Sequence, residues 1–532
     1  MIIVVSSDTV GEYAYSKSCG SMELPVERLR LSGTEIYQNG GVAAEHPRCS
    51  EIGVQMMEMG GNAVDAAIAG LLCVGVVNNF AAGIGGDASG AYEVIDFREA
   101  AARSAHQDMF NKNTTLATDS TLGMGVPGEI RGFATAHARH GKLPWAALFE
   151  PSIRLARKGF PRFKNKLLKS KGMRETYFHK DGRPKEVGDF IYRRNLARTL
   201  GKIAKNGPDI FYSGEIADHI ISTVEDDQGG ITKEDMMSYE VKIREPVVAE
   251  VAGFKIITPG APTCGPLIIQ ILKVVEKLGL GSPENVTTVQ KIIEAFKFAY
   301  VDRMQLGDPD FVAHMDDLVA KIISDERASE IAPRIRKCDS HGTTNLVASD
   351  KYGYGVSAVS TVNLEWGNRI MDYETGIIFN NQLDDFSIPK MNNSFGLPPS
   401  EANFIMPFKR PLSSATPVIL ERDGKVFMVL GGAGGSRIIT AVAEMIIRVV
   451  MLGMDPDKAM DSCRLHHQLI PDVILAEHRC DSALLKKLSG IGHTIIIMGA
   501  EQTSTSVNMV LVNGAGIVPI SDPRKGGLAA GY

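Results

Sequence analysis

Hydrophobic residues follow two different patterns in the two parts of the chain. In the first part they recur mostly at the three- and four-residue spacing of amphipathic helices. This spacing predicts helices that end at Met59 and then over residues 62–80, within 143–207, and over 267–278, 289–304 and 318–335. After Thr343, short runs bounded by Gly, Asn, Asp or Pro predict strands over residues 345–349, 356–364, 376–380, 417–421 and 426–430. A long apolar helix over residues 436–452 and late strands over 493–498 and 506–512 follow.

The order of these elements predicts the fold class. Residues 1–40 have no steady periodicity and are expected to form a poorly structured leader, followed by a short strand at residues 41–44. Helices dominate the next part of the chain and strands dominate the last part. Because no low-complexity linker separates the two parts, we expect α+β layers that share one core.

Composition and charge exclude several classes of protein. The 532 residues are 44% hydrophobic and 22% charged, which is ordinary for a soluble globular protein. A formal net charge of −5 argues against a protein that binds nucleic-acid phosphates, which would carry a basic patch. The best candidate for a membrane helix, residues 63–77, is shorter than the ~20 apolar residues required. The opening MIIVVSSDTV is too brief for a signal peptide.

Cysteines and glycosylation sequons bear on the cellular compartment. Seven cysteines without a CxxC pair make neither a disulfide scaffold nor a zinc site. Cys49 and Cys73 stand in consecutive predicted helices, where they either face each other or are two small buried residues. Sequons at Asn113, Asn285 and Asn392 would be used only if the chain is secreted.

Thr343, in the stretch HGTTN, is a candidate nucleophile. If the chain is cut after Gly342, the new α-amino group of Thr343 has a pKa near ~7.7–8.0 and becomes a base within reach of its own hydroxyl. Gly342 would tolerate a strained backbone at the cut. Taken alone, this tripeptide is better interpreted as the polar entry to a strand.

Two downstream segments supply groups suited to an amino acid head. In STVN, Thr361 and Asn363 share a face of a strand, so one could orient the nucleophile while the other binds substrate. In NNQLDDF, Gln382, Asp384 and Asp385 suit an ammonium group. Their spacing is not that of a calcium loop.

Two further segments suit anions. Ser413 and Ser414, in RPLSSATP, could donate hydrogen bonds to a carboxylate. In GGAGGSR, backbone N–H groups between a strand and a helix could bind an oxyanion, whereas the nucleotide-binding motifs GxxxxGK[ST] and GxGxxG are not matched. Adjacent His466 and His467 have no carboxylate at ligand spacing and are expected to be structural.

Taken in order, these segments resemble the γ-glutamyltransferase (γ-glutamyl transpeptidase) family of N-terminal-nucleophile hydrolases. The late segments FGLPPSEANFI and RKGGLAAGY resemble its animal members. The similarity extends from about residue 40 to residue 532. It rests on RCSEIG, GGNAVDAAIAGLLCVGVV, GIGG, VIDFRE, GVPGEIRG, EAFKFAYVDR, LGDPDF, GTTN, STVN, GIIFNNQLDDFS, PLSSATP, GGAGGSRI, RLHHQLIPDV and DPRKGG.

The resemblance implies a role for each matching residue. Thr343 would be the self-cleavage residue and nucleophile, oriented by Thr361, and Gly434 with Gly435 would stabilise the oxyanion. The substrate α-carboxylate would be bound by Arg98, Ser413 and Ser414, and its α-amino group by Asn363, Gln382 and Asp385. A planar guanidinium such as that of Arg98 matches a carboxylate bidentately.

The same resemblance implies a four-layer αββα sandwich, cut into segments 41–342 and 343–532 that remain one unit. It implies no cofactor and no metal, glutathione and γ-glutamyl compounds as donors, and water, amino acids or dipeptides as acceptors. It also implies a Cys49–Cys73 disulfide and a cell-surface or extracellular location.

The chain departs from the family pattern at four places. It is shorter by about one strand between GIGG and VIDFRE, and shorter again before Gly342. Asn345 stands where the family has His, and Phe408 where it has Gly. The alternatives to an active glutathione hydrolase are therefore a member that keeps the fold without turnover, and an acylase with another amide substrate.

Overall fold

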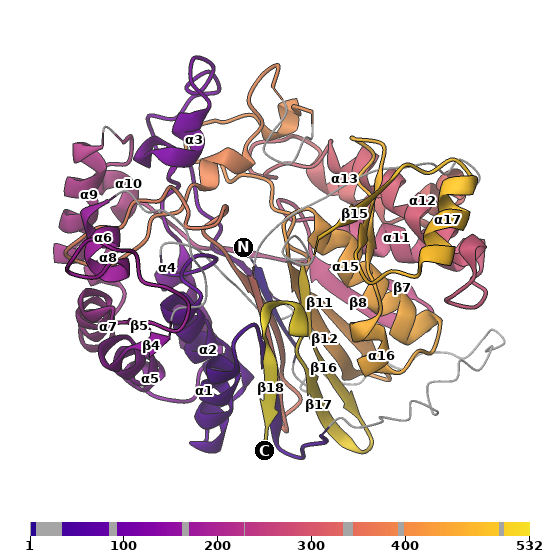
Figure 1. The fold of residues 1–532 in the computed structure, drawn as a ribbon, viewed down its shortest axis with the longest axis horizontal. Coiled ribbons are helices and arrows are strands. Elements are labelled where there is room, and N and C mark those ends of the chain that lie inside the picture. The colour runs from indigo at the N-terminus through magenta and orange to yellow at the C-terminus, as the bar shows by residue number, and fades with distance from the viewer. Residues whose placement is uncertain are drawn as a thin grey trace.

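Two stacked β-sheets form the centre of the molecule, and helices cover the outer face of each (Figure 1). This architecture is seen in a computed structural model, which describes residues 2–6, 35–84, 93–161, 170–227, 229–332, 344–391, 398–499 and 505–532. The helices of the first third of the chain lie on one side, and those after residue 260 lie on the other. The four layers agree with the expected αββα sandwich.

The first sheet has seven strands that come from distant parts of the chain. Their order is β18 (Leu528–Gly531), β2 (Gly40–Ala44), β9 (Thr344–Asp350), β10 (Gly355–Ser360), β1 (Ile2–Ser6), β3 (Val94–Asp96) and β6 (Lys242–Arg244). Every neighbouring pair is antiparallel.

The prediction of a poorly structured leader is wrong for residues 2–6. β1 pairs with β10 through Val4 and Ser357 and with β3 through Ile3 and Ile95, so it lies inside the sheet. The β-branched run that seemed too short for a signal peptide has the composition of a strand.

The second sheet has six strands. Their order is β17 (Gly516–Ile520), β16 (Ser506–Asn513), β12 (Lys425–Ala433), β11 (Val418–Arg422), β8 (Phe254–Pro259) and β7 (Pro246–Val251). Aliphatic residues that include Val347 of the first sheet and Ile419, Val429 and Val510 of the second form a buried cluster. Apolar contacts of this kind hold two sheets face to face.

The helices that cover the first sheet include α1 (Pro47–Glu58), α2 (Ala63–Val77), α4 (Glu129–His140), α5 (Trp145–Lys158), α7 (Arg194–Asn206) and α9 (Glu215–Asp226). α2 begins at a capping box in which Asn62 and Asp65 bond each other's backbone N–H groups, and all fifteen of its residues are buried. Within the described residues, no helix is both long enough and apolar enough to cross a bilayer.

The second sheet is covered by α11 (Gly265–Leu278), α12 (Val286–Arg303), α13 (Met315–Ile322), α14 (Asp325–Ile331) and α15 (Arg437–Ile446), which continues as the π-helical turn η5 (Ile447–Met451). The predicted helix over residues 318–335 is therefore two helices, separated where Ser324 caps α14. The strand predicted over 376–380 is not formed, and only an isolated bridge joins Met371 to Ile378.

A three-stranded sheet of β13 (Leu465–His466), β14 (Ile474–Glu477) and β15 (Ile495–Met498) lies beside α17 (Ser482–Gly490).

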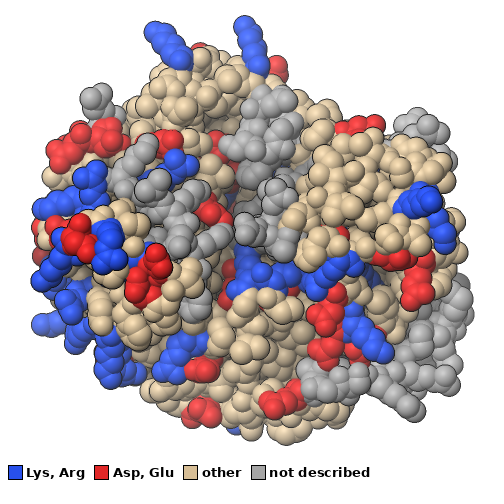
Figure 2. All heavy atoms as spheres, viewed as in Figure 1, with Lys and Arg blue, Asp and Glu red and all other residues tan. Residues whose placement is uncertain are grey.

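Two disulfides link parts of the described chain. One joins Cys49 of α1 to Cys73 of α2, as the resemblance implied, and the other, which the sequence did not suggest, joins Cys463 to Cys480. On the face drawn in Figure 2, acidic and basic side chains are intermingled, with no field of one sign.

Candidate active site

Arg98 lies two residues beyond β3 and is 1% exposed. Its Nη2 atom pairs with Oδ2 of Asp385, and its Nε donates to the Pro411 carbonyl over 3.2 Å. Nη1 has no hydrogen-bond partner among the described residues and lies 3.6 Å from Oε2 of Glu99. A buried guanidinium with one unused donor is suited to receive an anion.

The backbone of Arg98 is held from three directions. Its N–H donates to Asp96, and its carbonyl accepts hydrogen bonds from the Tyr239 hydroxyl over 2.9 Å and from Nε of Arg410 over 3.3 Å. Burial acts to raise the pKa of Asp96, but the charges of Arg410 and Arg244 outweigh it and hold that pKa well below its ordinary value. Asp96 is therefore a fixed anion that anchors the loop.

Gln382 and Asp385 lie on the short helix η3 (Gln382–Asp385). Nε2 of Gln382 donates to Oδ2 of Asp385 over 2.9 Å, and the Gln382 backbone N–H donates to Asn380 over 3.0 Å. Oε1 of Gln382 is buried without a partner among the described residues. The structure thus brings Asp385 into contact with Arg98, although 287 positions separate them in the chain, and Asp385 in turn contacts Gln382.

Thr361 and Asn363 follow β10 directly. Oγ1 of Thr361 accepts a hydrogen bond from the Asn363 N–H over 2.9 Å, so the hydroxyl proton points to another acceptor. Asn363 has a φ of 69°, a conformation that Asn tolerates better than most residues. Its Nδ2 donates to the Asn381 carbonyl over 3.1 Å and to Oδ2 of Asp384 over 3.3 Å. The amide thus contacts the NNQLDDF segment.

Ser413 and Ser414 lie on the segment that leads into β11. Oγ of Ser413 accepts from the Ala415 N–H over 3.1 Å, and Oγ of Ser414 accepts from Nη2 of Arg303 over 2.9 Å. Two residues earlier, the Pro411 carbonyl accepts from Arg98. The serine pair therefore lies on the same short segment as a backbone contact of Arg98.

Gly434 and Gly435 connect β12 to α15. Their φ angles are 141° and 63°, and a Cβ on Gly434 would lie 2.6 Å from Oγ1 of Thr505, so only glycine fits at that position. Neither backbone N–H has a hydrogen-bond acceptor among the described residues. Two N–H donors at the start of a helix, both without an acceptor in the described part of the chain, form a suitable oxyanion site.

Two buried glutamates lie close to this site. Glu99 is 0% exposed, and neither of its carboxyl oxygens has a partner among the described residues. Burial raises the pKa of Glu99 to about 7, despite the opposing charge of Arg98. Burial also raises the pKa of Glu129 well above its usual range, although its Oε2 accepts from the Ser360 hydroxyl over 2.7 Å.

Other expectations are left untested or differ in detail. Gly342, Thr343 and Asn392 lie outside the described residues, so the cleavage point remains a prediction. Asn345 is buried in β9, and its Nδ2 donates to the Ala358 carbonyl over 2.7 Å. Phe408 adopts a φ of 64°, which explains why glycine is usual there.

The histidine pair is internal. Both side chains are buried, and Nδ1 of His466 contacts the hydroxyl of Thr440. In the described part of the chain, no group of His, Cys, Asp and Glu has the arrangement of a metal site.

Sequence reasoning did not single out Arg303 or Glu99 as members of the site. Both stand inside family motifs, EAFKFAYVDR and VIDFRE, but only the fold shows that Arg303 contacts Ser414 and that Glu99 lies beside Arg98. We refer below to Arg98, Glu99, Gln382 and Asp385 as the Arg98 cluster.

Comparison with known proteins is consistent with this geometry. The Gamma-glutamyltranspeptidase family profile matches residues 49–532. The chain is 38% identical over 534 residues to glutathione hydrolase proenzyme 1 of Schizosaccharomyces pombe, covering 93% of this chain and 85% of that protein. It is 35% identical over 539 residues to the glutathione hydrolase proenzyme of Escherichia coli K12, covering 93% and 92%.

Solved structures confirm the fold class. A cephalosporin acylase from Bacillus halodurans superposes with a TM-score of 0.82 at 23% identity, covering 98% of this chain and 99% of that one. The Helicobacter pylori gamma-glutamyltranspeptidase superposes with a TM-score of 0.52 at 32% identity, covering 58% of this chain and 94% of that one. The fold is that of N-terminal-nucleophile hydrolases, and the chain belongs to the γ-glutamyltranspeptidase family.

Proposed function

We propose that this protein is a self-processed glutathione hydrolase and γ-glutamyltransferase. The observation that carries the proposal is that Asp385 contacts both Arg98 and Gln382, while Arg98 also contacts the segment that holds the serine pair. A γ-glutamyl head carries one carboxylate and one ammonium, and this cluster offers a guanidinium for the first and a carboxylate for the second. Relatives named glutathione hydrolase in a fungus and a bacterium support the same activity.

The proposed reaction has two acyl-transfer steps. Oγ of Thr343 attacks the γ-carbonyl carbon, its proton passes to the Thr343 α-amino group, and the N–H groups of Gly434 and Gly435 stabilise the oxyanion. The C–N bond then breaks, and the leaving amine takes up the proton. Water or the amino group of an amino acid or dipeptide attacks the resulting ester, which returns the Thr343 hydroxyl.

A second candidate is a family member that folds without turnover, and it rests on the shortened segments. The substitution of Asn for His at position 345 does not favour it, because Asn345 bonds across the strand pair and lies in the sheet. An acylase with a different substrate rests only on similarity of fold.

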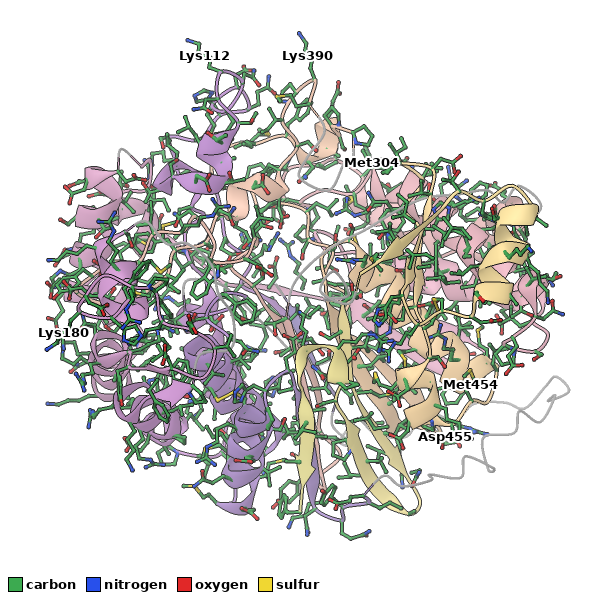
Figure 3. The ribbon with its side chains drawn as sticks, in the orientation of Figure 1. Lys112, Lys180, Met304, Lys390, Met454 and Asp455 are labelled. Carbon is green, nitrogen blue, oxygen red and sulfur yellow. A yellow bond between two sulfur atoms is a disulfide. The ribbon has the colours of Figure 1, made fainter. Side chains whose placement is uncertain are left out.

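We also propose that the protein works at the cell surface or outside the cell, with glycans on its sequons. Asn113 and Asn285 are both exposed, and the Oδ1 atom of each accepts a local backbone N–H, which leaves Nδ2 to carry a sugar. Figure 3 shows Lys112, the neighbour of Asn113, pointing outward from the molecule. Removal of N-glycans from protein secreted by eukaryotic cells should increase its gel mobility, and unchanged mobility would contradict this part of the proposal.

Denaturing gel electrophoresis and an activity assay test the main proposal. Wild-type protein should give two fragments, with Thr343 as the N-terminal residue of the smaller one, and Thr343→Ala should give one band. Wild-type protein should also release the anilide from γ-glutamyl-p-nitroanilide. Cleavage without any turnover would support the inactive family member, and a single uncut band for both proteins would reject self-processing.

A further inference from the structure

Arg303 is a buried cation that the proposed chemistry has not used. It is the last residue of α12, 7% exposed, and precedes Met304, which is labelled in Figure 3. No carboxylate lies within 4.0 Å of its guanidinium in the described part of the chain, and its Nε has no hydrogen-bond partner there. Burying a guanidinium without a counter-ion is costly.

The groups around Arg303 do not neutralise it. Asp302, its neighbour in the chain, accepts hydrogen bonds from Arg327 and from Gln270. The thiol of Cys264 contacts Arg303, but burial raises the pKa of that thiol, so it stays neutral. The partial negative charge at the C-terminus of α12 offsets only part of the charge of Arg303.

The contact between the Arg303 guanidinium and the Ser414 hydroxyl is informative. Nη2 donates to Oγ of Ser414 over 2.9 Å, so a lone pair of that hydroxyl is occupied by a cationic donor. A hydroxyl that accepts such a bond turns its own proton away from the donor. Ser413 is prepared in the same way, because its Oγ accepts the Ala415 N–H. Both serines are thereby oriented as hydrogen-bond donors.

Arg98 and Arg303 contact the same short segment, at the Pro411 carbonyl and at Ser414, but their charge environments differ. Arg98 is paired with Asp385, whereas Arg303 has no carboxylate partner among the described residues. A substrate carboxylate bound by Ser413 and Ser414 would therefore be attracted by a second positive charge close to one serine.

We propose that Arg303 is a positioning and specificity residue for the α-carboxylate of the substrate. It fixes the Ser414 hydroxyl as a donor and adds a positive charge beside the bound carboxylate. This inference rests on the proposed function for its choice of substrate. It predicts selectivity for donors that carry a free α-carboxylate over donors that lack it.

The test compares two donors that differ only in that group, γ-glutamyl-p-nitroanilide and 4-aminobutyryl-p-nitroanilide. Loss of one charge-assisted hydrogen bond is worth roughly tenfold or more, so Arg303→Gln should raise KM for the glutamyl donor about tenfold. We expect kcat to change less than about threefold, and kcat/KM for the aminobutyryl donor less than about twofold. Arg303→Lys, which keeps the charge, should recover part of the lost affinity.

Two controls separate positioning from folding. Arg448→Gln removes another mostly buried arginine, which bonds Glu444 and the Cys463 carbonyl, and should leave both donors unaffected. In a Ser414→Ala background, Arg303→Gln should add less than it does in the wild type, since part of its effect passes through that hydroxyl. Equal losses on both donors, or an unchanged KM, would overturn the proposal.

A binding measurement keeps the inference independent of turnover. L-Glutamate should raise the melting temperature of the wild-type protein and raise that of Arg303→Gln much less at the same concentration. If the wild type has no activity but shows this difference, the proposed function fails and the role of Arg303 stands. If glutamate protects both proteins equally, the role of Arg303 fails whatever the activity.

Discussion

Two buried charge clusters in this molecule use the same kinds of residues in opposite ways. The Arg464 cluster, which comprises Arg464, Glu477, Asp522 and Arg524, joins the three-stranded sheet to the C-terminal turn η7 (Pro523–Lys525). All four carboxylate oxygens of Glu477 and Asp522 accept hydrogen bonds from Arg524, Arg464 or backbone N–H groups. In the Arg98 cluster, four polar atoms have no hydrogen-bond partner among the described residues, against one, Nε of Arg464, in the Arg464 cluster.

The pKa values follow the same division. In the Arg464 cluster, burial acts to raise the pKa of Glu477 and of Asp522, but the arginines outweigh it and both pKa values fall below the ordinary range. In the Arg98 cluster, burial prevails and raises the pKa of Glu99. A network that serves stability satisfies its own hydrogen bonds, whereas one that serves binding keeps donors and acceptors for a ligand.

Removing Arg98 tests the difference between the two clusters with the largest expected effect. Arg98→Gln should lower kcat/KM for γ-glutamyl-p-nitroanilide by about 10²–10³-fold, because loss of a buried charged partner costs about 2–5 kcal/mol. Steady-state kinetics measures the loss, and a melting curve checks that the fold persists. A large fall in melting temperature with unchanged kinetics in the folded protein would reverse the assignment of the cluster.

The matching change in the Arg464 cluster should act on stability. Asp522→Asn leaves Arg464 without its carboxylate partner and should lower the free energy of unfolding by about 3–5 kcal/mol. Thermal melting measures it, and Asp423→Asn, at a carboxylate that is 95% exposed, is the control. The KM of the folded fraction should stay within about twofold of wild type. A selective rise in KM would show that the Arg464 cluster also contributes to substrate binding.

The two clusters should also respond oppositely to pH. Because the folded protein holds the Glu99 proton up to a pKa of about 7, against an ordinary value of 4.5, the stabilisation from the neutral carboxyl is complete below about pH 4.5. It is lost as the pH rises toward 7, and amounts to about 3 kcal/mol at most. Glu99→Gln should flatten this decline in melting temperature between pH 5 and pH 8.

For Asp522, the lowered pKa gives the reverse sign. Its stabilisation is present above the ordinary aspartate pKa and is lost as the pH falls through the lower folded value. Melting curves of Asp522→Asn should therefore lose part of the acid dependence of the wild type. An unaltered slope in either variant would show that another group titrates in its place.

The smallest expected effect concerns the second disulfide. Cys463 directly precedes Arg464, and the bridge to Cys480 closes a loop with a sequence separation of 17. Replacing both cysteines with Ser should lower stability by about 2 kcal/mol through the entropy of the unfolded chain. The melting temperature should fall without a change in KM, and a changed KM would couple this bridge to the Arg98 cluster.

Much of the fold follows from local patterns, but strand partners do not. The spacing of apolar residues predicts the bounds of α11 and α12 to within three residues, because both helices have buried apolar residues over several turns. The same kind of pattern predicts a strand that continues to residue 364, whereas β10 ends at Ser360. The chain leaves the sheet from Thr361 to Asn363, where the candidate site lies. Functional residues break the local rule that a strand prediction depends on.

The site was predictable only as a set of motifs. Sequence identifies Ser414 and Arg98 through their motifs, but Arg303 meets Ser414 across 111 residues and Arg98 meets Asp385 across 287. Such contacts are created by the tertiary fold and leave no periodic signal along the chain. The position of β1 in the sheet could not be predicted for the same reason, because a five-residue strand carries no signal of a partner about 350 residues away.

The order of strands in the first sheet determines what self-cleavage can separate. With the proposed cut between residues 342 and 343, β9, β10 and β18 would belong to one polypeptide and β1, β2, β3 and β6 to the other. The two polypeptides alternate at three strand boundaries there, and meet again between β8 and β11 in the second sheet. Neither polypeptide can leave as an intact body without opening hydrogen-bonded ladders in both sheets. The interleaved sheets would therefore make the two-chain product of the proposed cut behave like one molecule on dilution.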